Sequence, residues 1–507
     1  MLQEDQVAES TANGQRVRAA VRSGVVEGLR DGGVARFLGV SFAAAPFGDN
    51  RMRPPRPVQP WAGVRPAIEY GPTAPKEPYA PQFRDLLPEV DIPGEDCLNL
   101  NIWTPDPSAG GLPVLVFIHG GAFLAGSGSV EQYDGSAFAR DGIVCVTINY
   151  RLGAEGFLHL GDGHANLGLL DQLAALTWVQ ENIAAFGGDP ARVTVAGESA
   201  GAMSVTTLLA MEQSQGLFSQ AIAQSGGALH TLTDELGRTV GRRLAKRLDL
   251  EPDRAALRLV KPSVLSAAVR DLVDEVQGTP DPGRWGSLAL TLTPFAPSID
   301  GEVLTRHPLA ALRSGVNSSV RLLTGWNREE ARFFLVASGA IDLIDDAALE
   351  AAAQGYGLTA SGLDLYRRNR SGASAGDVLA AVFGDWMFAM PAIRVAEARN
   401  ADARTWVYRF DHPENRSNHG FGAAHASELP YVFDTIHQEP THPLIGDSPS
   451  HDVADAVHGT WVRFIRDGDP GWRQYQPNMR YVGVIAKGLN EERDPAGAER
   501  EAWDGVC

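Results

Sequence analysis

The chain has 507 residues, of which 44% are hydrophobic, so it is long and apolar enough to bury a large core. Its formal net charge of −18 argues against a nucleic-acid partner, because phosphate binding requires a clustered positive surface. No apolar run approaches roughly 18 residues, and the acidic first ten residues lack the apolar segment of a signal peptide. We therefore expect neither a membrane-spanning segment nor a nucleic-acid partner.

Cysteine is sparse in this sequence. Only Cys97, Cys145 and Cys507 are present. An odd set of this size in a long chain provides no disulfide framework, which is typical of a reducing cytoplasm. We expect a cytoplasmic protein that is a monomer or a small homo-oligomer.

Predicted elements alternate between strand and helix along most of the chain. Short runs over 17–40, separated by glycine, indicate antiparallel strands, and the proline-rich stretch 54–81 indicates an irregular connection. Leu169, Leu173 and Leu176 are spaced for one face of a helix over 166–185. Further strands are predicted at 114–118, 143–148, 193–196, 221–223, 322–323 and 406–410, and a further helix at 202–211.

This alternation predicts an α/β fold with a mostly parallel sheet and helices on both faces. Two helix-rich segments, at about 230–290 and 335–400, are too long to be simple loops, so we expect them to cap one end of the sheet. Residues 1–16 are polar and are expected to be flexible. The remainder, 17–507, is expected to form a single domain.

Two segments match the G-x-S-x-G pattern of a nucleophilic serine, and their contexts differ. Ser199, in Gly197-Glu-Ser-Ala-Gly201, lies between a predicted strand and a predicted helix, as a nucleophile elbow requires. Ser374 follows the charged run 367–370, which is not a buried strand. We therefore predict that Ser199 is a nucleophile and that Ser374 lies in an ordinary flexible turn.

A glycine-rich loop follows the predicted strand 114–118. Its sequence, His119-Gly-Gly-Ala-Phe123, allows consecutive N–H groups to converge on one point, as an oxyanion hole requires. The N–H of Ala200, the residue after the predicted nucleophile, is expected to contribute a further donor. We expect His119 to support this loop rather than to act as a base.

Two longer segments resemble the signature sequences of type-B carboxylesterases, a family that includes cholinesterases and a bacterial p-nitrobenzyl esterase. They are E-D-C-L-N-L-N-I-W-T-P at 95–105 and F-G-G-D-P-A-R-V-T-V-A-G-E-S-A-G at 186–201. Further similar segments are N-Y-R-L-G at 149–153, N-L-G-L-L-D-Q at 166–172 and Q-S-G at 224–226. The resemblance extends from about residue 25 to 503, and it implies one α/β-hydrolase domain.

The resemblance also implies roles for individual residues. It places the nucleophile at Ser199 and the oxyanion N–H groups at Gly121, Ala122 and Ala200. It places the acid at Glu330, in Gly325-Trp-Asn-Arg-Glu-Glu330, and the base at His425. The order serine, acid, histidine agrees with this fold. The residues alone leave His412, His419, His437 and His442 as equal candidates for the base, and Glu329 as a competitor of Glu330.

Several neighbouring residues are expected to have supporting roles. Glu198, Ser225 and Glu428 are candidates for the surroundings of the triad, and Arg151 is expected to pair with Asp171. The family often has a cysteine near residue 74 that pairs with the one at 97, but here that residue is Ala74. Plausible residues for the substrate pocket are Phe123, Trp326, Phe333 and Phe334; Trp326 and Arg332 stand where smaller residues are usual.

The implied function is hydrolysis of small-molecule carboxylic esters through an acyl-enzyme, with no metal and no organic cofactor. Because the histidine must be neutral to act as a base, activity is expected to rise through an apparent pKa near about 6.5. One alternative is the same triad acting on carbamates, amides or another specialised acyl substrate. A remote alternative is a cholinesterase-like binding module without catalysis.

Overall fold

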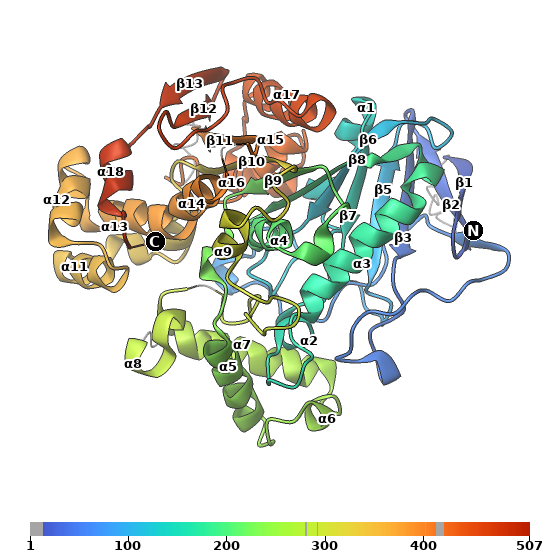
Figure 1. Ribbon diagram of the computed structural model, residues 1–507, viewed down its shortest axis with the longest axis horizontal. Helices are drawn as coiled ribbons and strands as arrows, with labels where there is room; N and C mark the ends of the chain where they lie inside the picture. Colours follow the sequence, from blue (N-terminus) through green and yellow to red (C-terminus); the bar gives the residue numbers. More distant parts are fainter. Residues whose placement is uncertain (1–13, 279–280, 292, 401, 412–419, 507) are drawn as a thin grey trace, which may run out of the picture.

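The computed structural model describes residues 14–278, 281–291, 293–400, 402–411 and 420–506. Its strands form a 13-stranded sheet with the order β1-β2-β3-β5-β7-β6-β8-β9-β10-β11-β12-β13, and β4 pairs with β2 (Figure 1). The strands are β1 Gln15–Val21, β2 Gly24–Asp31, β3 Val34–Ser41, β4 Val64–Pro66, β5 Asn99–Thr104, β6 Leu112–Ile118, β7 Val144–Ile148, β8 Gly188–Glu198, β9 Gln220–Gln224, β10 Arg321–Asn327, β11 Thr405–Phe410, β12 Tyr481–Ile485 and β13 Leu489–Arg493.

Helices connect the strands and cover both faces of the sheet. They are α1 Ser136–Arg140, α2 Gly153–Phe157, α3 Leu167–Asn182, α4 Ala200–Leu209, α5 Asp234–Arg247, α6 Arg254–Leu257, α7 Pro262–Gly278, α8 Pro282–Trp285, α9 Pro308–Arg313, α10 Arg332–Ala337, α11 Asp346–Gly355, α12 Ala360–Asn369, α13 Ala375–Gly384, α14 Met390–Ala398, α15 Leu429–Val432, α16 His442–Ile445, α17 His451–Asp467 and α18 Gly497–Ala502. A π-helical turn, η9 (Asp385–Ala389), joins α13 to α14.

The centre of the sheet, from β7 to β12, is parallel. Both edges are antiparallel except for β4, which pairs parallel with β2. Because parallel strands end at the same edge, the segments that follow β6, β8, β9 and β10 meet there, where ligands bind in open α/β sheets. This confirms the expected mostly parallel sheet with helices on both faces.

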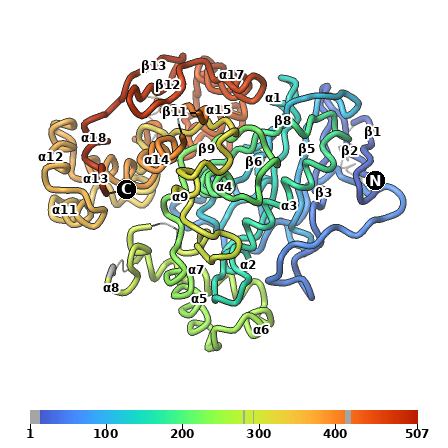
Figure 2. The backbone as a smooth tube through the Cα atoms, viewed as in Figure 1, coloured from blue at the N-terminus to red at the C-terminus, as the bar shows by residue number. Residues whose placement is uncertain are grey.

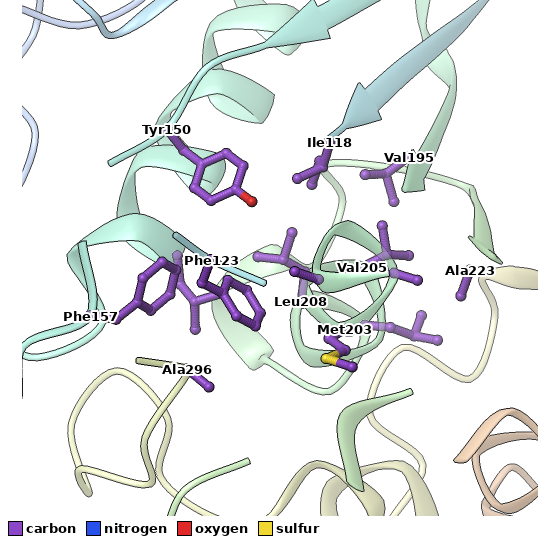
Figure 3. Packing of buried hydrophobic residues seen from close by; sticks show 14 of the residues in the cluster. Ile118, Phe123, Tyr150, Phe157, Val195, Met203, Val205, Leu208, Ala223 and Ala296 are labelled. Atoms are coloured by element: carbon purple, nitrogen blue, oxygen red, sulfur yellow. The ribbon is translucent and has the colours of Figure 1, made fainter. Parts of the chain in front are cut away.

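Alternation along the central strands divides the core into two clusters. On β6, Val114, Val116 and Ile118 belong to one cluster and Leu115 and Phe117 to the other, because successive side chains point to opposite faces. The first cluster includes side chains of α3, α4 and α14, and the second includes those of α1, α15 and α17. Helix α4 is buried along its whole length, since its apolar side chains pack against strand residues on one side and loops on the other (Figure 3).

The two expected cap segments are largely helical. Helices α5 to α8 and helices α11 to α13 form two groups that lie away from the strands near the N-terminus (Figures 1 and 2). The continuous helical run Ala375–Ala398 is long and apolar enough to cross a membrane, but 89% of its most apolar window is buried inside the protein. Because the run is buried in this way, it is a core helix of the protein.

The boundaries and number of strands differ from the expectation at several places. The first strand begins at Gln15, so the last two residues of the segment expected to be flexible are paired with β2; residues 1–13 lie outside the described residues. Strands β4, β5, β12 and β13 were not predicted, and β4 lies within the stretch 54–81 that was expected to be irregular. In β5 the side chains of Asn99 and Asn101 are buried and hydrogen-bonded, so the strand lacks an apolar pattern.

Candidate active site

Ser199 occupies the sharp turn between β8 and α4. Its backbone has φ 56° and ψ −122°, a conformation that non-glycine residues rarely adopt and that often marks functional sites. The turn is held by the Ser199 N–H, which donates to the carbonyl of Gln224 at 2.9 Å. A Cβ at Gly201 would lie 2.0 Å from the Ile118 carbonyl oxygen, so only glycine fits there. The small residues of the motif therefore let the turn form.

Glu330 and His425, distant in sequence, form a buried pair. The His425 Nδ1 lies 2.7 Å from the Glu330 Oε2, and the His425 backbone N–H donates to the Glu330 carbonyl at 3.2 Å. The other carboxylate oxygen of Glu330 accepts the backbone N–H of Asn327 at 2.7 Å. The acid is thus fixed at the end of β10, and it fixes the ring of the histidine.

The second ring nitrogen of His425 contacts a different carboxylate. Its Nε2 lies 3.2 Å from the Glu198 Oε1, and Glu198 directly precedes Ser199. Ser199, Glu198 and His425 all line one cavity. Between these described residues no hydrogen bond joins the Ser199 hydroxyl to His425. The structure therefore places Ser199 and His425 at one cavity, with Glu330 behind the histidine, but without a serine–histidine hydrogen bond. In free enzymes this bond is often long or poorly aligned.

The carboxylates around His425 determine its protonation. Burial opposes the charged ring, but Glu198 and Glu330 outweigh burial and raise the pKa of His425 to about 9. Burial raises the pKa of Glu198, although the nearby His425 opposes this rise. The two carboxylates therefore favour the charged form of the His425 ring. The expected titration near 6.5 is for an unperturbed imidazole and does not fit this environment.

The glycine-rich loop after β6 approaches the elbow closely. A Cβ at Gly120 would lie 2.8 Å from the Glu198 Oε2, and Gly121 and Ala122 have φ values of 105° and 56°. Neither Gly121 nor Ala122 donates its N–H to another described residue, and both line the cavity with Ser199. Because Ala200 is the first residue of α4, its N–H has no partner inside the helix. These are the N–H groups predicted for an oxyanion hole.

His119 supports this loop, as expected. Its Nδ1 lies 2.8 Å from the Gly120 carbonyl oxygen, and its ring stacks on Tyr150 with centroids 4.5 Å apart. The Tyr150 hydroxyl donates to the His119 carbonyl at 2.9 Å. Burial lowers the pKa of His119 to about 4, so its ring is neutral.

Two of the expected supporting residues, Glu428 and Ser225, differ in their contacts around the candidate triad. Glu428 accepts hydrogen bonds from the side chains of Gln224 at 3.1 Å and Asn327 at 2.5 Å, and burial, reinforced by Glu330, raises its pKa. It therefore connects the elbow to the acid loop. Ser225 is buried and donates its N–H to Gly325 at 2.9 Å, but within the described residues it bonds to neither Glu330 nor His425.

Other candidates have different roles. Glu329 accepts the N–H of Ala423 at 2.9 Å, and so holds the histidine loop rather than the histidine ring. His442 lies 3.1 Å from the Ile436 carbonyl; His412 and His419 lie outside the described residues. The expected pair of Arg151 and Asp171 is present, with an Nη2–Oδ1 distance of 2.6 Å.

Ser374 is not in a flexible turn, contrary to the expectation. It is the N-cap of α13, where its hydroxyl accepts the N–H of Asp377 at 3.1 Å and forms a capping box with that residue. Cys97 and Cys145 are buried and free, as expected for a chain without the family's cysteine near residue 74.

The cavity beside Ser199 has a volume of about 560 Å³. Phe333 and Phe334 line it, as expected, whereas Phe123 and Trp326 do not line it and instead pack in the core. Phe123 turns away because its positive φ of 62° directs the ring against Phe157, at a centroid distance of 4.8 Å (Figure 3). Arg332 also stays out of the cavity wall and pairs with Asp377.

Two important neighbours of the triad were not predicted. Asn327 positions both Glu330 and Glu428, yet its only signal was its place two residues after Gly325 in the acid segment. The Phe388 ring lies 4.5 Å from the His425 ring, and it comes from the π-helical turn η9. No pattern in the sequence marks that turn.

The comparisons with known proteins agree over nearly the whole chain. A model described as the carboxylesterase family matches residues 15–494. Para-nitrobenzyl esterase of Bacillus subtilis (strain 168) is 35% identical over 498 residues, which are 94% of this chain and 96% of that protein. Phenmedipham hydrolase of Pseudarthrobacter oxydans is 35% identical over 463 residues, which are 89% of this chain and 90% of that protein. The crystal structure of a carboxylesterase from Geobacillus stearothermophilus at pH 6.2 superposes with a TM-score of 0.84 at 35% identity, covering 96% of this chain and 99% of that chain.

These matches cover both the sheet and the segments that surround the elbow. At this identity and coverage they establish the α/β-hydrolase fold and the chemistry of a serine carboxylesterase, a carboxylic ester hydrolase. The chain belongs to the carboxylesterase family.

Proposed function

We propose that Ser199, His425 and Glu330 form the catalytic triad of this esterase. The observation that carries the proposal is the buried pair of Glu330 and His425, 2.7 Å apart, at the same cavity as a serine in a strained elbow. A carboxylate behind the ring selects the imidazole tautomer whose Nε2 can accept a proton, and it stabilises the imidazolium that forms.

In the first half of the reaction, the Ser199 oxygen attacks the ester carbonyl carbon while its proton passes to the Nε2 of His425. The carbonyl electron pair moves to the oxygen, which the N–H groups of Gly121, Ala122 and Ala200 stabilise. When the tetrahedral intermediate collapses, the C–O bond to the alcohol breaks. The leaving alkoxide takes the proton from His425, and an acyl-serine remains.

In the second half, water replaces the alcohol. His425 takes a proton from the water, whose oxygen attacks the acyl carbonyl, and the proton then returns to the Ser199 oxygen as the acid departs. Neither half requires a metal or an organic cofactor. The ring nitrogen that contacts Glu198 must exchange this contact for the serine hydroxyl, and we propose that substrate binding favours this exchange by filling the cavity.

The substrates we propose are small-molecule carboxylic esters. Carbamates and amides remain the second candidate, because the same triad attacks any acyl carbonyl and pocket shape selects the leaving group. A binding module without catalysis is disfavoured by the intact pair of Glu330 and His425 beside Ser199. A cytoplasmic location, the absence of membrane and nucleic-acid partners, and a monomer or small homo-oligomer remain predictions.

Non-additive mutant kinetics test the triad. Because triad members act as a unit, Ser199→Ala and His425→Ala should each lower kcat/KM for a p-nitrophenyl ester by at least about 10,000-fold, and the double variant should lose little more. Losses that multiply in the double variant would contradict the proposal.

The two candidate functions are ranked by kcat/KM of the native enzyme for matched ester, carbamate and amide substrates. If kcat/KM is higher for the carbamate than for the ester, carbamates become the proposed substrates in place of esters.

A further inference from the structure

One wall of the active-site cavity contains two buried hydroxyl groups. Thr291 and Thr293 follow the 3-10 turn η7 (Gly286–Ala289), and both line the cavity together with Ser199. Their side chains are almost fully enclosed, since Thr291 is 7% and Thr293 is 2% exposed. The lining of the cavity combines aliphatic and aromatic side chains, such as Val273, Leu290 and Phe383, with polar ones, such as Arg270, Asp274 and Gln277.

Neither hydroxyl has a hydrogen-bond partner in the part of the chain that the structure describes. Other buried threonines of this protein do have one: Thr206 and Thr207 donate to main-chain carbonyls at 2.9 and 2.7 Å, and Thr147 donates to Gly128. Of the described buried threonines, Thr324 also lacks a partner, but it does not line the cavity. Thr291 and Thr293 are therefore exceptional in this protein, and they share one wall.

A buried hydroxyl without a partner destabilises the fold, and valine has nearly the same shape without this cost. A substrate that presents a hydrogen-bonding group to this wall recovers the lost interaction. Each hydroxyl offers one donor and two acceptor positions, so ether, carbonyl, hydroxyl and N–H groups all fit. Two neutral hydroxyls do not offset the desolvation of an ion, so this pair suits an uncharged group.

We propose that Thr291 and Thr293 form a polar subsite of the esterase, and that its preferred substrates are esters with an uncharged hydrogen-bonding group at some distance from the reacting carbonyl. This inference rests on the proposed function, because it assumes that the acyl group or the alcohol occupies the cavity beside Ser199. The group can lie on either side of the ester bond, and the experiment distinguishes the two sides.

The experiment uses ether oxygens as probes of the subsite in the full-length protein. In the acyl arm, p-nitrophenyl octanoate is compared with analogues in which an ether oxygen replaces successive methylene groups. In the alcohol arm, octyl acetate is compared with the corresponding ether analogues. Each rate is divided by the rate of alkaline hydrolysis of the same ester, because an ether oxygen also changes the reactivity of the carbonyl.

For native enzyme, we expect at least one ether analogue in one arm to have a higher normalised kcat/KM than the all-carbon ester. Thr291→Val or Thr293→Val should reduce that preference about tenfold, the effect of one lost hydrogen bond, measured within each variant as the ratio of kcat/KM for the ether ester to kcat/KM for the all-carbon ester. Thr291→Ser and Thr293→Ser keep the hydroxyl and should keep the preference.

Two results would overturn the subsite. The first is native enzyme that favours no ether position in either arm, a measurement that does not depend on the folding of any variant. The second is a valine variant in which kcat/KM falls equally for all esters, which would show that the threonine has only a structural role. Failure of the proposed function is separate, because it would appear as ester hydrolysis that survives in Ser199→Ala.

Discussion

Ser199 and Ser374 lie in the same five-residue pattern, yet the fold uses them in opposite ways. Ser199 has φ 56° between β8 and α4 and lines the cavity, whereas Ser374 has φ −67° and starts α13 at the surface. The last glycine of the pattern does not explain the difference, because a Cβ at Gly201 would lie 2.0 Å from the Ile118 carbonyl oxygen and a Cβ at Gly376 would lie 1.9 Å from the Ile341 carbonyl oxygen. The first glycine does differ: a Cβ at Gly197 would lie 2.5 Å from the Gly201 carbonyl carbon, whereas a Cβ at Gly372 meets no atom within 4 Å.

The comparison shows that the pattern acquires chemistry only from its neighbours. Around Ser199 lie a carboxylate–histidine pair, a carboxylate at residue 198 and unpaired N–H groups of a glycine-rich loop. The Ser374 hydroxyl instead bonds to the carboxylate of Asp377 at 2.9 Å, and among the described residues no histidine bonds to it. The same hydroxyl is therefore a nucleophile in one place and a helix cap in the other.

The largest expected effect is the loss of activity in Ser199→Ala. We expect kcat/KM for a p-nitrophenyl ester to fall at least about 10,000-fold, because the acyl-enzyme cannot form, while far-ultraviolet circular dichroism stays native. Ser374→Ala is the matched control and should keep kcat within about twofold. Equal losses in both variants would show that the comparison of contexts is wrong.

The next effect distinguishes two adjacent carboxylates. Glu330→Gln should lower kcat by about 100- to 10,000-fold with little change in KM, because the ring loses the partner that sets its tautomer and stabilises its charge. Glu329→Gln should lower kcat only slightly, since Glu329 bonds to the backbone of Ala423. Steady-state kinetics of the two variants at one pH make the test; a larger loss in Glu329→Gln would reassign the acid.

A smaller effect concerns pH. Burial lowers the pKa of His425, but Glu198 and Glu330 raise it to about 9, so the base is protonated over much of the neutral range. Removing one negative charge in Glu198→Gln should lower that pKa. The rising limb of kcat/KM should then move to lower pH, and the plateau should fall because the imidazolium of the transition state loses a stabilising charge.

The measurement is the pH dependence of kcat/KM from pH 5 to 10 for native enzyme and Glu198→Gln, with a substrate for which chemistry limits the rate. Native enzyme should have its midpoint above about 6.5, the value of an unperturbed imidazole. Coincident midpoints in the two proteins would show that Glu198 does not act on His425.

The smallest effect is on stability. Ser374→Ala removes the hydroxyl that caps α13 and should lower the free energy of unfolding by about 1 kcal/mol, measured in urea. Ser374→Asp keeps a capping oxygen and should restore most of the loss. A stability change at residue 374 with no change in activity completes the contrast with residue 199.

Much of the fold was predictable because it follows from apolar patterns. The strands at the centre of the sheet and helices α3 and α4 have uninterrupted or periodic apolar residues, and they lie within a few residues of the predicted positions. β5 was missed because Asn99 and Asn101 are buried and paired with other polar groups, which no local pattern reveals.

The candidate site was predictable in its parts but not in its surroundings. Ser199 and the loop after β6 follow from local motifs, and Glu330 and His425 follow from the family resemblance. The contacts of His425 with Glu198 and Phe388 depend on how η9 and the elbow pack, and they change the expected titration of the base. Trp326 and Phe123 were placed wrongly because side-chain direction in a turn or strand end depends on backbone angles that the sequence does not show.

The most direct test of the central claim is the location of the acyl group during turnover. Native enzyme is mixed with a slowly deacylated p-nitrophenyl ester, quenched in acid, digested and analysed by mass spectrometry. The account predicts one acyl group per chain, on the peptide that contains Ser199, and none in His425→Ala at the same time. An acyl group on the peptide that contains Ser374, or turnover with no acylated serine, would contradict it.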